Sequence, residues 1–189
     1  MGRCGSSHFA SDRSLLIGLG LIAVCAGAFA VDSASSVAGS SQRWPPAGLA
    51  IPVDHVESSA LRDTFGDGRP GHRHEAIDIA APRGTKVLAV DDGEIVKLFT
   101  SVRGGLTVYQ FDPQGRLAYY YAHLDRYAET VHEGMTVHRC DLIGYVGSTG
   151  NAPADAPHLH FATFLLGARK HWWEGTAINP FPALRGSCD

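Results

Sequence analysis

The chain has 189 residues and a mass of 20.1 kDa, which is enough for one domain of ordinary size plus a short targeting segment but not for two domains. Apolar residues make up 44% and charged residues 19%, a composition that excludes an intrinsically disordered chain. The formal net charge is -3, with Lys and Arg spread along the sequence. This distribution excludes a phosphate-neutralising surface, so we expect no nucleic-acid partner. A monomer is the expected oligomeric state.

The segment 1–30 has the features of an export signal. Its uncharged apolar run at 15–30 follows two arginines and ends in an Ala-Phe-Ala pattern. Because this run is shorter than the roughly 20 residues that cross a bilayer, and because small-x-small patterns mark cleavage sites, we expect cleavage before Val31. The alternatives are retention as an N-terminal membrane anchor and lipid attachment at Cys25. Each of them predicts a protein of the periplasm or cell envelope, or a secreted protein.

The segment 31–50 is rich in serine and alanine and is predicted to be a linker, which leaves 51–189 as the folded domain. After removal of the signal, Cys140 and Cys188 are the two cysteines that remain. In an oxidising compartment they can form one disulfide. Two unpaired thiols are the alternative, because the sequence does not give the distance between the two Cα atoms.

Within the domain, runs rich in Val, Ile, Tyr, Phe and Thr alternate with turns rich in Gly, Pro and Asp, which is typical of β-strands. The predicted strands lie at 86–90, 94–99, 106–111, 117–123, 142–146 and 158–165. No long stretch has a helical period, and one short helix is expected at 124–131. The fold class is therefore mainly β, a single compact domain of antiparallel sheet with short helical segments and with hairpins between consecutive strands.

The first motif with chemical potential is His-Glu-Ala-Ile-Asp at 74–78, in which an imidazole and a carboxylate stand four positions apart. On an extended backbone two such side chains share a face and can converge on one point. A zinc-binding helix with Glu75 as general base would be a misreading, because Gly and Pro flank the motif and β-rich sequence follows it. A surface histidine and an aspartate at a turn would be the simpler interpretation of this motif alone.

Two further histidine motifs follow. In the strand predicted at 158–165, the period of two places His158 and His160 on one face and their apolar neighbours on the other. Such a pair suits the edge of a metal site, with one ring as a ligand and the other beside it, although His-x-His is also common on exposed strands. His123 ends an aromatic strand, where a buried core histidine is the ordinary interpretation. The histidines that fit none of these motifs are interpreted as solvated or structural: His72, His132, His138 and His171.

Taken in this order, the three motifs resemble the LytM-type, lysostaphin-like peptidoglycan endopeptidases of peptidase family M23. The hallmarks of that family are His-x-x-x-Asp, a later single histidine and a terminal His-x-His. The similarity extends over 65–161 and includes the Gly-x-Thr-Gly segment at 147–150. Ala76 departs from the pattern, because the family usually has Gly there. The resemblance implies the lysostaphin-like peptidase fold, described as a duplicated hybrid motif.

Carried over position by position, the resemblance implies that His74, Asp78 and His160 bind one zinc ion per chain, while His123 and His158 remain unligated. This donor set agrees with catalytic zinc sites, which take three protein ligands and leave the fourth position to water. Bound zinc of this kind acidifies its water and polarises the scissile carbonyl. The two unligated histidines would accept the proton and donate hydrogen bonds to the oxyanion, in an order that the sequence leaves open.

The implied function is zinc-dependent hydrolysis of amide bonds in the stem or cross-link peptides of peptidoglycan. The main alternative is a non-catalytic member of the family that binds peptidoglycan or activates an amidase, but such proteins lack some metal ligands and this chain has all three. A D-Ala-D-Ala dipeptidase or carboxypeptidase would space its His and Asp more widely. The sequence does not decide which bond is cut.

Overall fold

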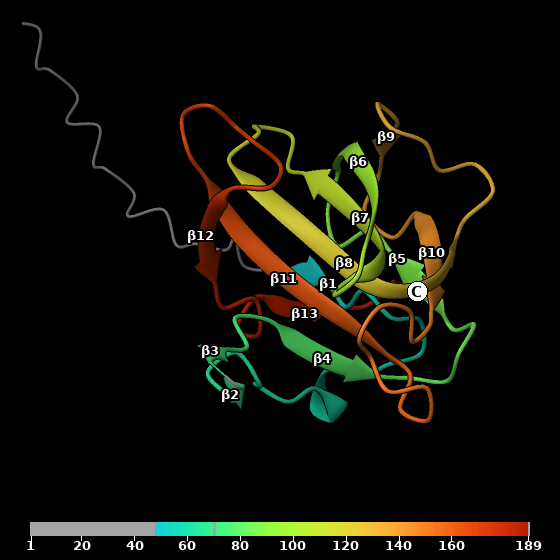
Figure 1. Ribbon diagram of the computed structural model, residues 1–189. Helices are drawn as coiled ribbons and strands as arrows, with labels where there is room; N and C mark the ends of the chain where they lie inside the picture. The colour runs from blue at the N-terminus through green and yellow to red at the C-terminus, as the bar shows by residue number, and fades with distance from the viewer. Residues whose placement is uncertain (1–47, 70, 189) are drawn as a thin grey trace, which may run out of the picture. The chain divides into compact units, whose positions relative to one another are not determined.

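The computed structural model describes residues 48–69 and 71–188 (Figure 1). The predicted export signal and residues 31–47 of the predicted linker lie outside the described residues. The last two linker residues form strand β1 (Leu49–Ala50) and are buried, so among the described residues these two belong to the folded domain. Within the part of the chain that is described, no helix is long and apolar enough to cross a membrane.

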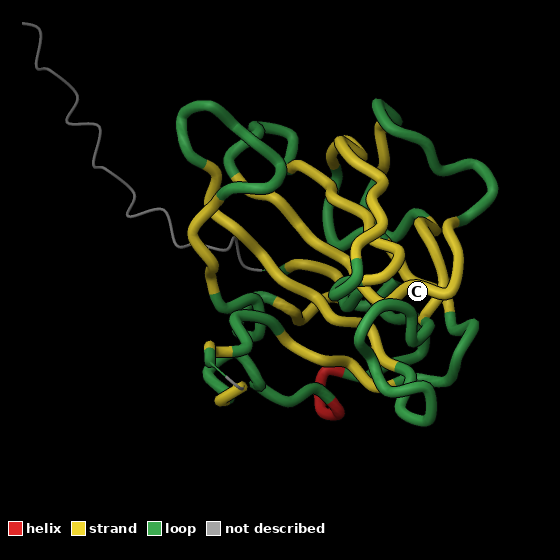
Figure 2. Tube along the Cα trace, viewed as in Figure 1, coloured by secondary structure: helices red, strands yellow, loops and turns green. Residues whose placement is uncertain are grey.

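A nine-stranded sheet dominates the domain. Figure 2 shows the strands of the domain in yellow. Neighbouring strands are antiparallel in the order β12-β11-β8-β7-β6-β9, while β4 pairs with β11, and β10 pairs with both β8 and β5. The strands of this sheet are β4 (Ile77–Ala80), β5 (Lys86–Leu88), β6 (Gly93–Ser101), β7 (Gly105–Phe111), β8 (Leu117–Tyr127), β9 (Thr136–Val137), β10 (Leu142–Val146), β11 (His158–Leu166) and β12 (Gly175–Ile178). All the predicted strands are present, and the predicted class of mainly antiparallel β is confirmed.

Two small sheets complete the described strands. In one of them β1 runs parallel to β13 (Leu184–Gly186). In the other, β2 (Gly68–Arg69) and β3 (His72–Arg73) form a short antiparallel hairpin. This hairpin lies just before β4 in the chain and, as shown below, forms one wall of the candidate site.

The helix predicted at 124–131 is wrong. Strand β8 continues to Tyr127, and its second half pairs with β10. Leu124, which the prediction placed at the start of the helix, is fully buried in the core. Backbone pairing with a strand distant in sequence therefore outweighs the weak local preference of this short segment. The only helix among the described residues is the 3-10 helix η1 (Ser58–Ala60).

The alternation of side chains along β8 and β11 separates core residues from site residues. Tyr119 and Tyr121 on β8, and Leu159 and Phe161 on β11, are all fully buried. The Phe161 ring stacks on Tyr119 and tilts against Tyr121, with ring centroids 6.5 Å and 5.2 Å away. These two long strands lie side by side in Figure 1. A one-residue slip would expose this apolar face to solvent, so burial fixes the register.

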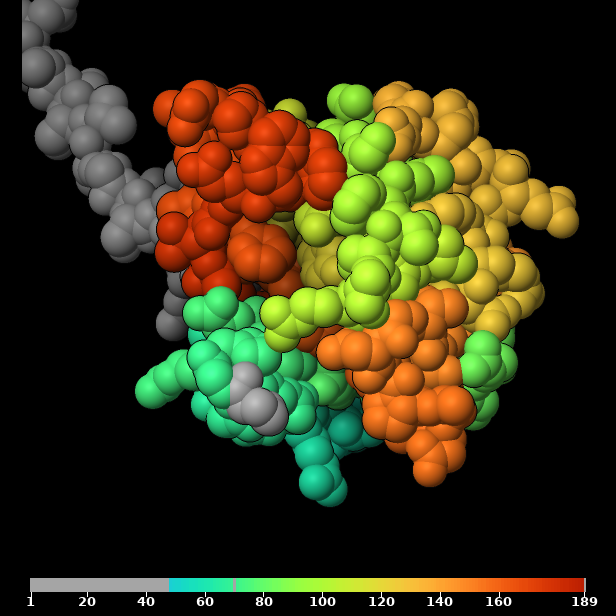
Figure 3. All heavy atoms as spheres, in the orientation of Figure 1, coloured from blue at the N-terminus to red at the C-terminus, as the bar shows by residue number. Residues whose placement is uncertain are grey.

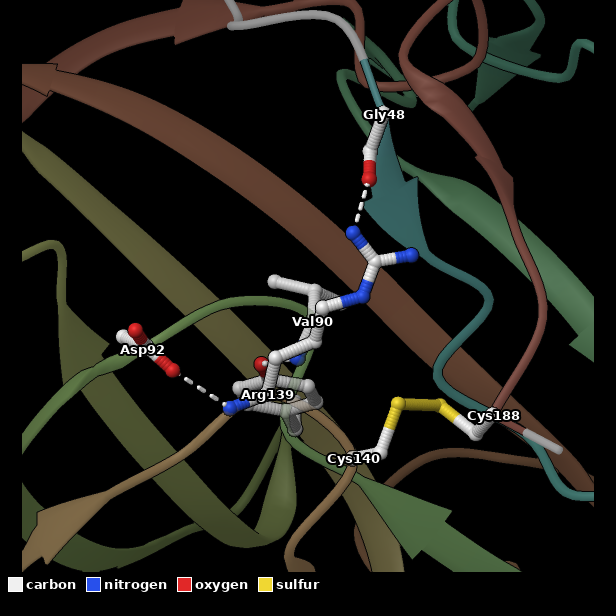
Figure 4. The surroundings of a disulfide bond; sticks show 7 residues. Gly48, Val90, Asp92, Arg139, Cys140 and Cys188 are labelled. Carbon is white, nitrogen blue, oxygen red and sulfur yellow. Dashed lines mark hydrogen bonds between the residues drawn. A yellow bond between two sulfur atoms is a disulfide. The ribbon is translucent and has the colours of Figure 1, made fainter.

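The two cysteines of the domain form a disulfide, a pairing that the sequence left open. Cys140, in the turn before β10, is bonded to Cys188 near the C-terminus, with their Cα atoms 5.5 Å apart (Figure 4). The neighbouring Arg139 donates a hydrogen bond to the carbonyl of Gly48, next to β1. The disulfide and this hydrogen bond therefore hold both ends of the described chain against the β10 turn.

Candidate metal centre

Strand pairing brings the distant motifs together. Asp78 on β4 lies directly opposite His160 on β11 in the antiparallel ladder, and side chains of directly opposite residues project from the same face. His74 reaches the same point from the turn between β3 and β4. Glu75 in that turn has a φ of 55° and is exposed. The backbone from 74 to 78 is therefore not one extended strand as expected, and the turn brings His74 to the site.

The donor atoms of these three side chains form a nearly equilateral triangle. His74 Nε2 lies 3.1 Å from His160 Nδ1, and Asp78 Oδ1 lies 3.0 Å from each of these nitrogens. Among the described residues, they are the group of histidine and carboxylate side chains able to hold a metal ion. Tetrahedral zinc with bonds of about 2.0–2.1 Å holds its ligands roughly 3.3–3.4 Å apart. The triangle therefore needs to open by only about 0.3 Å to fit zinc.

Contacts behind His74 and Asp78 fix the orientation of these two candidate ligands. His74 donates from Nδ1 to the carbonyl of Thr64, at 3.0 Å, which leaves Nε2 directed at the centre of the site. The Thr64 hydroxyl accepts a hydrogen bond from the backbone N–H of Asp78, at 3.1 Å. The second carboxylate oxygen of Asp78 accepts from the guanidinium of Arg69, at 2.7 Å. Such outer contacts set the tautomer and direction of metal ligands. Thr64 and Arg69 belong to no motif and were not predicted from the sequence.

The electrostatics of Asp78 and His74 favour the deprotonated forms of these two side chains, which a metal ion needs. Burial raises the pKa of Asp78, but the hydrogen bond and the charge of His160, together with the neighbouring imidazoles, outweigh burial and hold the pKa below its ordinary value. Burial lowers the pKa of His74, although the Asp78 carboxylate offsets part of this effect. A carboxylate and neutral imidazoles are the species that coordinate divalent cations.

The two remaining motif histidines lie beside this triangle. Their rings are 5.0 Å apart between centroids, and His158 Nε2 is 3.8 Å from Asp78 Oδ1. His123 donates from Nδ1 to the carbonyl of Thr149, and His158 donates to that of Ala156, both at 2.9 Å. A carbonyl only accepts, so each neutral ring carries its proton on Nδ1 and keeps Nε2 as an acceptor. Burial lowers the pKa of His123 to about 4, so this ring is neutral at pH 7.

Two glycines hold the loop that supports His123. The segment around Thr149 packs on the turn between β6 and β7, where the Thr149 hydroxyl accepts from the N–H of Leu106 at 3.0 Å. A Cβ on Gly150 would lie 2.3 Å from the nitrogen of Gly105, and one on Gly105 would lie 2.6 Å from the nitrogen of Gly150. Only residues without a side chain permit this approach. The Gly-x-Thr-Gly segment noted in the sequence therefore supports the site through its backbone.

A cleft of about 580 Å³ opens onto the four motif histidines and Asp78. Its walls are the β2–β3 hairpin, the β6–β7 turn and the loop before β11. Figure 3 shows these segments meeting in turquoise, yellow-green and orange. Tyr120 from β8 also lines the cleft, with its ring centroid 6.0 Å from that of His160. His72, interpreted from the sequence as solvated or structural, is exposed and lines the cleft.

In this antiparallel β domain, two imidazoles and one carboxylate surround a single point, and two further histidines lie beside it. This arrangement defines a candidate mononuclear metal centre of hydrolytic type. Residues 72–180 match the family described as Peptidase family M23, and the chain belongs to this family. The match covers every motif histidine and Asp78.

Relatives and solved structures agree with this assignment. The chain is 31% identical over 144 residues to the L-Ala–D-Glu endopeptidase of Bacillus subtilis (strain 168), covering 72% of this chain and 43% of the relative. It is 32% identical over 121 residues to the glycyl-glycine endopeptidase ALE-1 of Staphylococcus capitis, covering 64% of this chain and 31% of the relative. The catalytic domain of lysostaphin from Staphylococcus simulans is similar with a TM-score of 0.53 and 33% identity, covering 61% of this chain and 81% of that domain. The chain spans less than half the length of the curated relatives it matches.

Proposed function

We propose that this protein is a zinc-dependent endopeptidase that hydrolyses amide bonds in the stem or cross-link peptides of peptidoglycan. The observation that carries the proposal is the triangle of His74, Asp78 and His160 donor atoms, 3.0–3.1 Å apart, at a cleft that also holds two unligated histidines. The similarity to relatives named as an L-Ala–D-Glu endopeptidase and a glycyl-glycine endopeptidase supports the substrate class.

The roles of the residues follow from their geometry. His74, Asp78 and His160 would hold zinc, which supplies Lewis-acid polarisation of the scissile carbonyl and a lowered pKa for a water molecule. His123 and His158 present Nε2 acceptors at the same cleft, because their Nδ1 atoms are engaged by backbone carbonyls. One of them accepts the proton of the attacking water at Nε2. The other, when protonated, donates a hydrogen bond to the oxyanion.

The compartment is part of the same proposal. Peptidoglycan lies outside the cytoplasm, so the chain would be exported to the periplasm or cell envelope through its N-terminal segment. The disulfide between Cys140 and Cys188 supports this location, because disulfides persist in oxidising compartments and are rare in the cytosol. A non-catalytic peptidoglycan-binding role is the second candidate, and the complete set of metal donors argues against it.

The test uses the purified full-length chain and peptidoglycan sacculi. The chain is expected to contain about one zinc ion, as one open tetrahedral site requires, and to release peptide fragments from sacculi that mass spectrometry assigns to a single type of bond. Removal of zinc by a chelator should stop the release, and added zinc should restore it. His171→Ala serves as the control, because this histidine does not line the cleft. Equal release by zinc-free protein would refute the proposal.

A further inference from the structure

The mouth of the cleft carries a cluster of three basic side chains, of which only Arg69 has a role above, as a partner of Asp78. Arg69, His72 and Arg103 line the cleft from two different walls. Arg69 and His72 are directly paired across the β2–β3 hairpin. Arg103, in the turn between β6 and β7, places its guanidinium nitrogen 3.5 Å from His72 Nε2. In Figure 3 the yellow-green atoms of this turn extend towards the turquoise hairpin. The cluster therefore crosses the entrance of the cleft.

The position of Arg103 is set by the same loop that positions His123. The carbonyl of Arg103 accepts from the N–H of Asn151 at 3.0 Å, and the carbonyl of Gly104 accepts from the N–H of His123 at 2.8 Å. The Gly104 N–H donates to the hydroxyl of Ser101 at 2.9 Å. The backbone of Arg103 is thus held by hydrogen bonds on both sides. Its side chain starts from a fixed point at the cleft wall.

The charges in the cleft are unbalanced. Two guanidinium groups and one carboxylate line it, and that carboxylate, from Asp78, is one of the three metal donors. A bound zinc ion would add two further positive charges. Arginine remains charged at any pH that proteins tolerate, and its planar group matches a carboxylate in two-point hydrogen bonds. Asp78 is the one carboxylate among the described residues that line the cleft, and its second oxygen already pairs with Arg69. No lining carboxylate therefore remains to pair with Arg103.

We infer that Arg103, with Arg69 across the entrance, binds a free carboxylate of the substrate, so that the enzyme selects acidic stem peptides over uncharged glycine bridges. This inference rests on the proposed function and names the substrate class for it. Stem peptides carry free carboxylates close to their amide bonds, whereas a glycine bridge carries none. Arg103 acts as a binding residue that contacts the substrate carboxylate. Arg69 has a second role, because it also orients the Asp78 carboxylate.

The experiment compares two forms of one cross-linked stem-peptide dimer, with its carboxylates either free or converted to amides. For the full-length zinc-loaded chain, kcat/KM is expected to be about tenfold higher for the free form, a ratio equal to roughly 1.4 kcal/mol. Arg103→Gln should remove most of this difference in kcat/KM, because it should slow cleavage of the free form alone. Arg103→Lys should keep part of it, since the charge remains without the planar group.

Controls separate this inference from the proposed function. Arg169→Gln removes an exposed arginine that does not line the cleft and should keep the ratio. The His123→Ala chain should bind both dimers without cleaving them. Its dissociation constant is expected to be lower for the dimer with free carboxylates than for the amidated dimer. Cleavage of both forms at equal rates by the unchanged chain would overturn the inference and leave the proposed function standing. Cleavage of neither form would overturn both.

Discussion

Substitution of Gly150 tests whether the packing of two loops maintains the catalytic geometry. Gly150 has a φ of 74°, and a Cβ added there would lie 2.3 Å from the nitrogen of Gly105 and 2.4 Å from the carbonyl oxygen of Arg103. Gly150→Ala therefore forces the Thr149 loop away from the β6–β7 turn. The movement would weaken the hydrogen bond from His123 Nδ1 to the Thr149 carbonyl, which is 2.9 Å long.

The expected magnitude has two parts. An L-residue in the left-handed region costs about 1–2 kcal/mol, and overpacking against backbone atoms costs a further 1–3 kcal/mol or so. Gly150→Ala should thus lower the free energy of unfolding by about 2–5 kcal/mol. Gly134→Ala is the matched control, because Gly134 has a φ of 84° and no atom within 4 Å of the added Cβ. The control should lose only about 1–2 kcal/mol.

Urea unfolding and peptidoglycan hydrolysis measure the two effects. Since a misplacement of about 1 Å can cost roughly 100-fold in rate, kcat of Gly150→Ala should fall by about one to two orders of magnitude. Gly134→Ala should retain the kcat of the unchanged chain. If the two variants lose equal stability and Gly150→Ala keeps its kcat, the packing of these loops does not support His123 and the reasoning is refuted.

Three further predictions concern the metal, the core and the disulfide. His160→Ala should lose both zinc and activity, whereas His123→Ala should keep zinc and lose turnover; comparable zinc loss in both, measured by metal analysis, would contradict the assigned roles. Phe161→Ala should lower the free energy of unfolding by about 3–5 kcal/mol, because this ring is fully buried; a loss below 1 kcal/mol or so in urea unfolding would show that the core closes around the cavity. Cys188→Ser removes the disulfide that closes a loop of 48 residues, and the chain-entropy model predicts a loss of up to about 4 kcal/mol in the free energy of unfolding. A reductant should destabilise the unchanged chain but leave the unfolding of the variant as it is.

Much of the fold was predictable because the relevant signal is local. Runs rich in Val, Ile, Tyr, Phe and Thr between turns predicted the strands, and on β11 the period of two correctly separated Leu159 and Phe161 from His158 and His160. The spacing and order of the histidine motifs indicated the family. The failure at 124–131 has a physical cause, since β10, which lies outside that segment, supplies the backbone partners of the second half of β8.

Residue type and spacing, which are local properties of the chain, were enough to predict the side chains proposed to carry the chemistry. The positions of their atoms depend on tertiary contacts. The register of β4 against β11 places Asp78 opposite His160, and the turn at Glu75 adds His74. Arg69 and Arg103 line the cleft, and Thr64 contacts His74, from segments without a motif. Contacts between residues far apart in the chain depend on the free energy of strand pairing and loop packing, and this free energy cannot be predicted from a local sequence pattern.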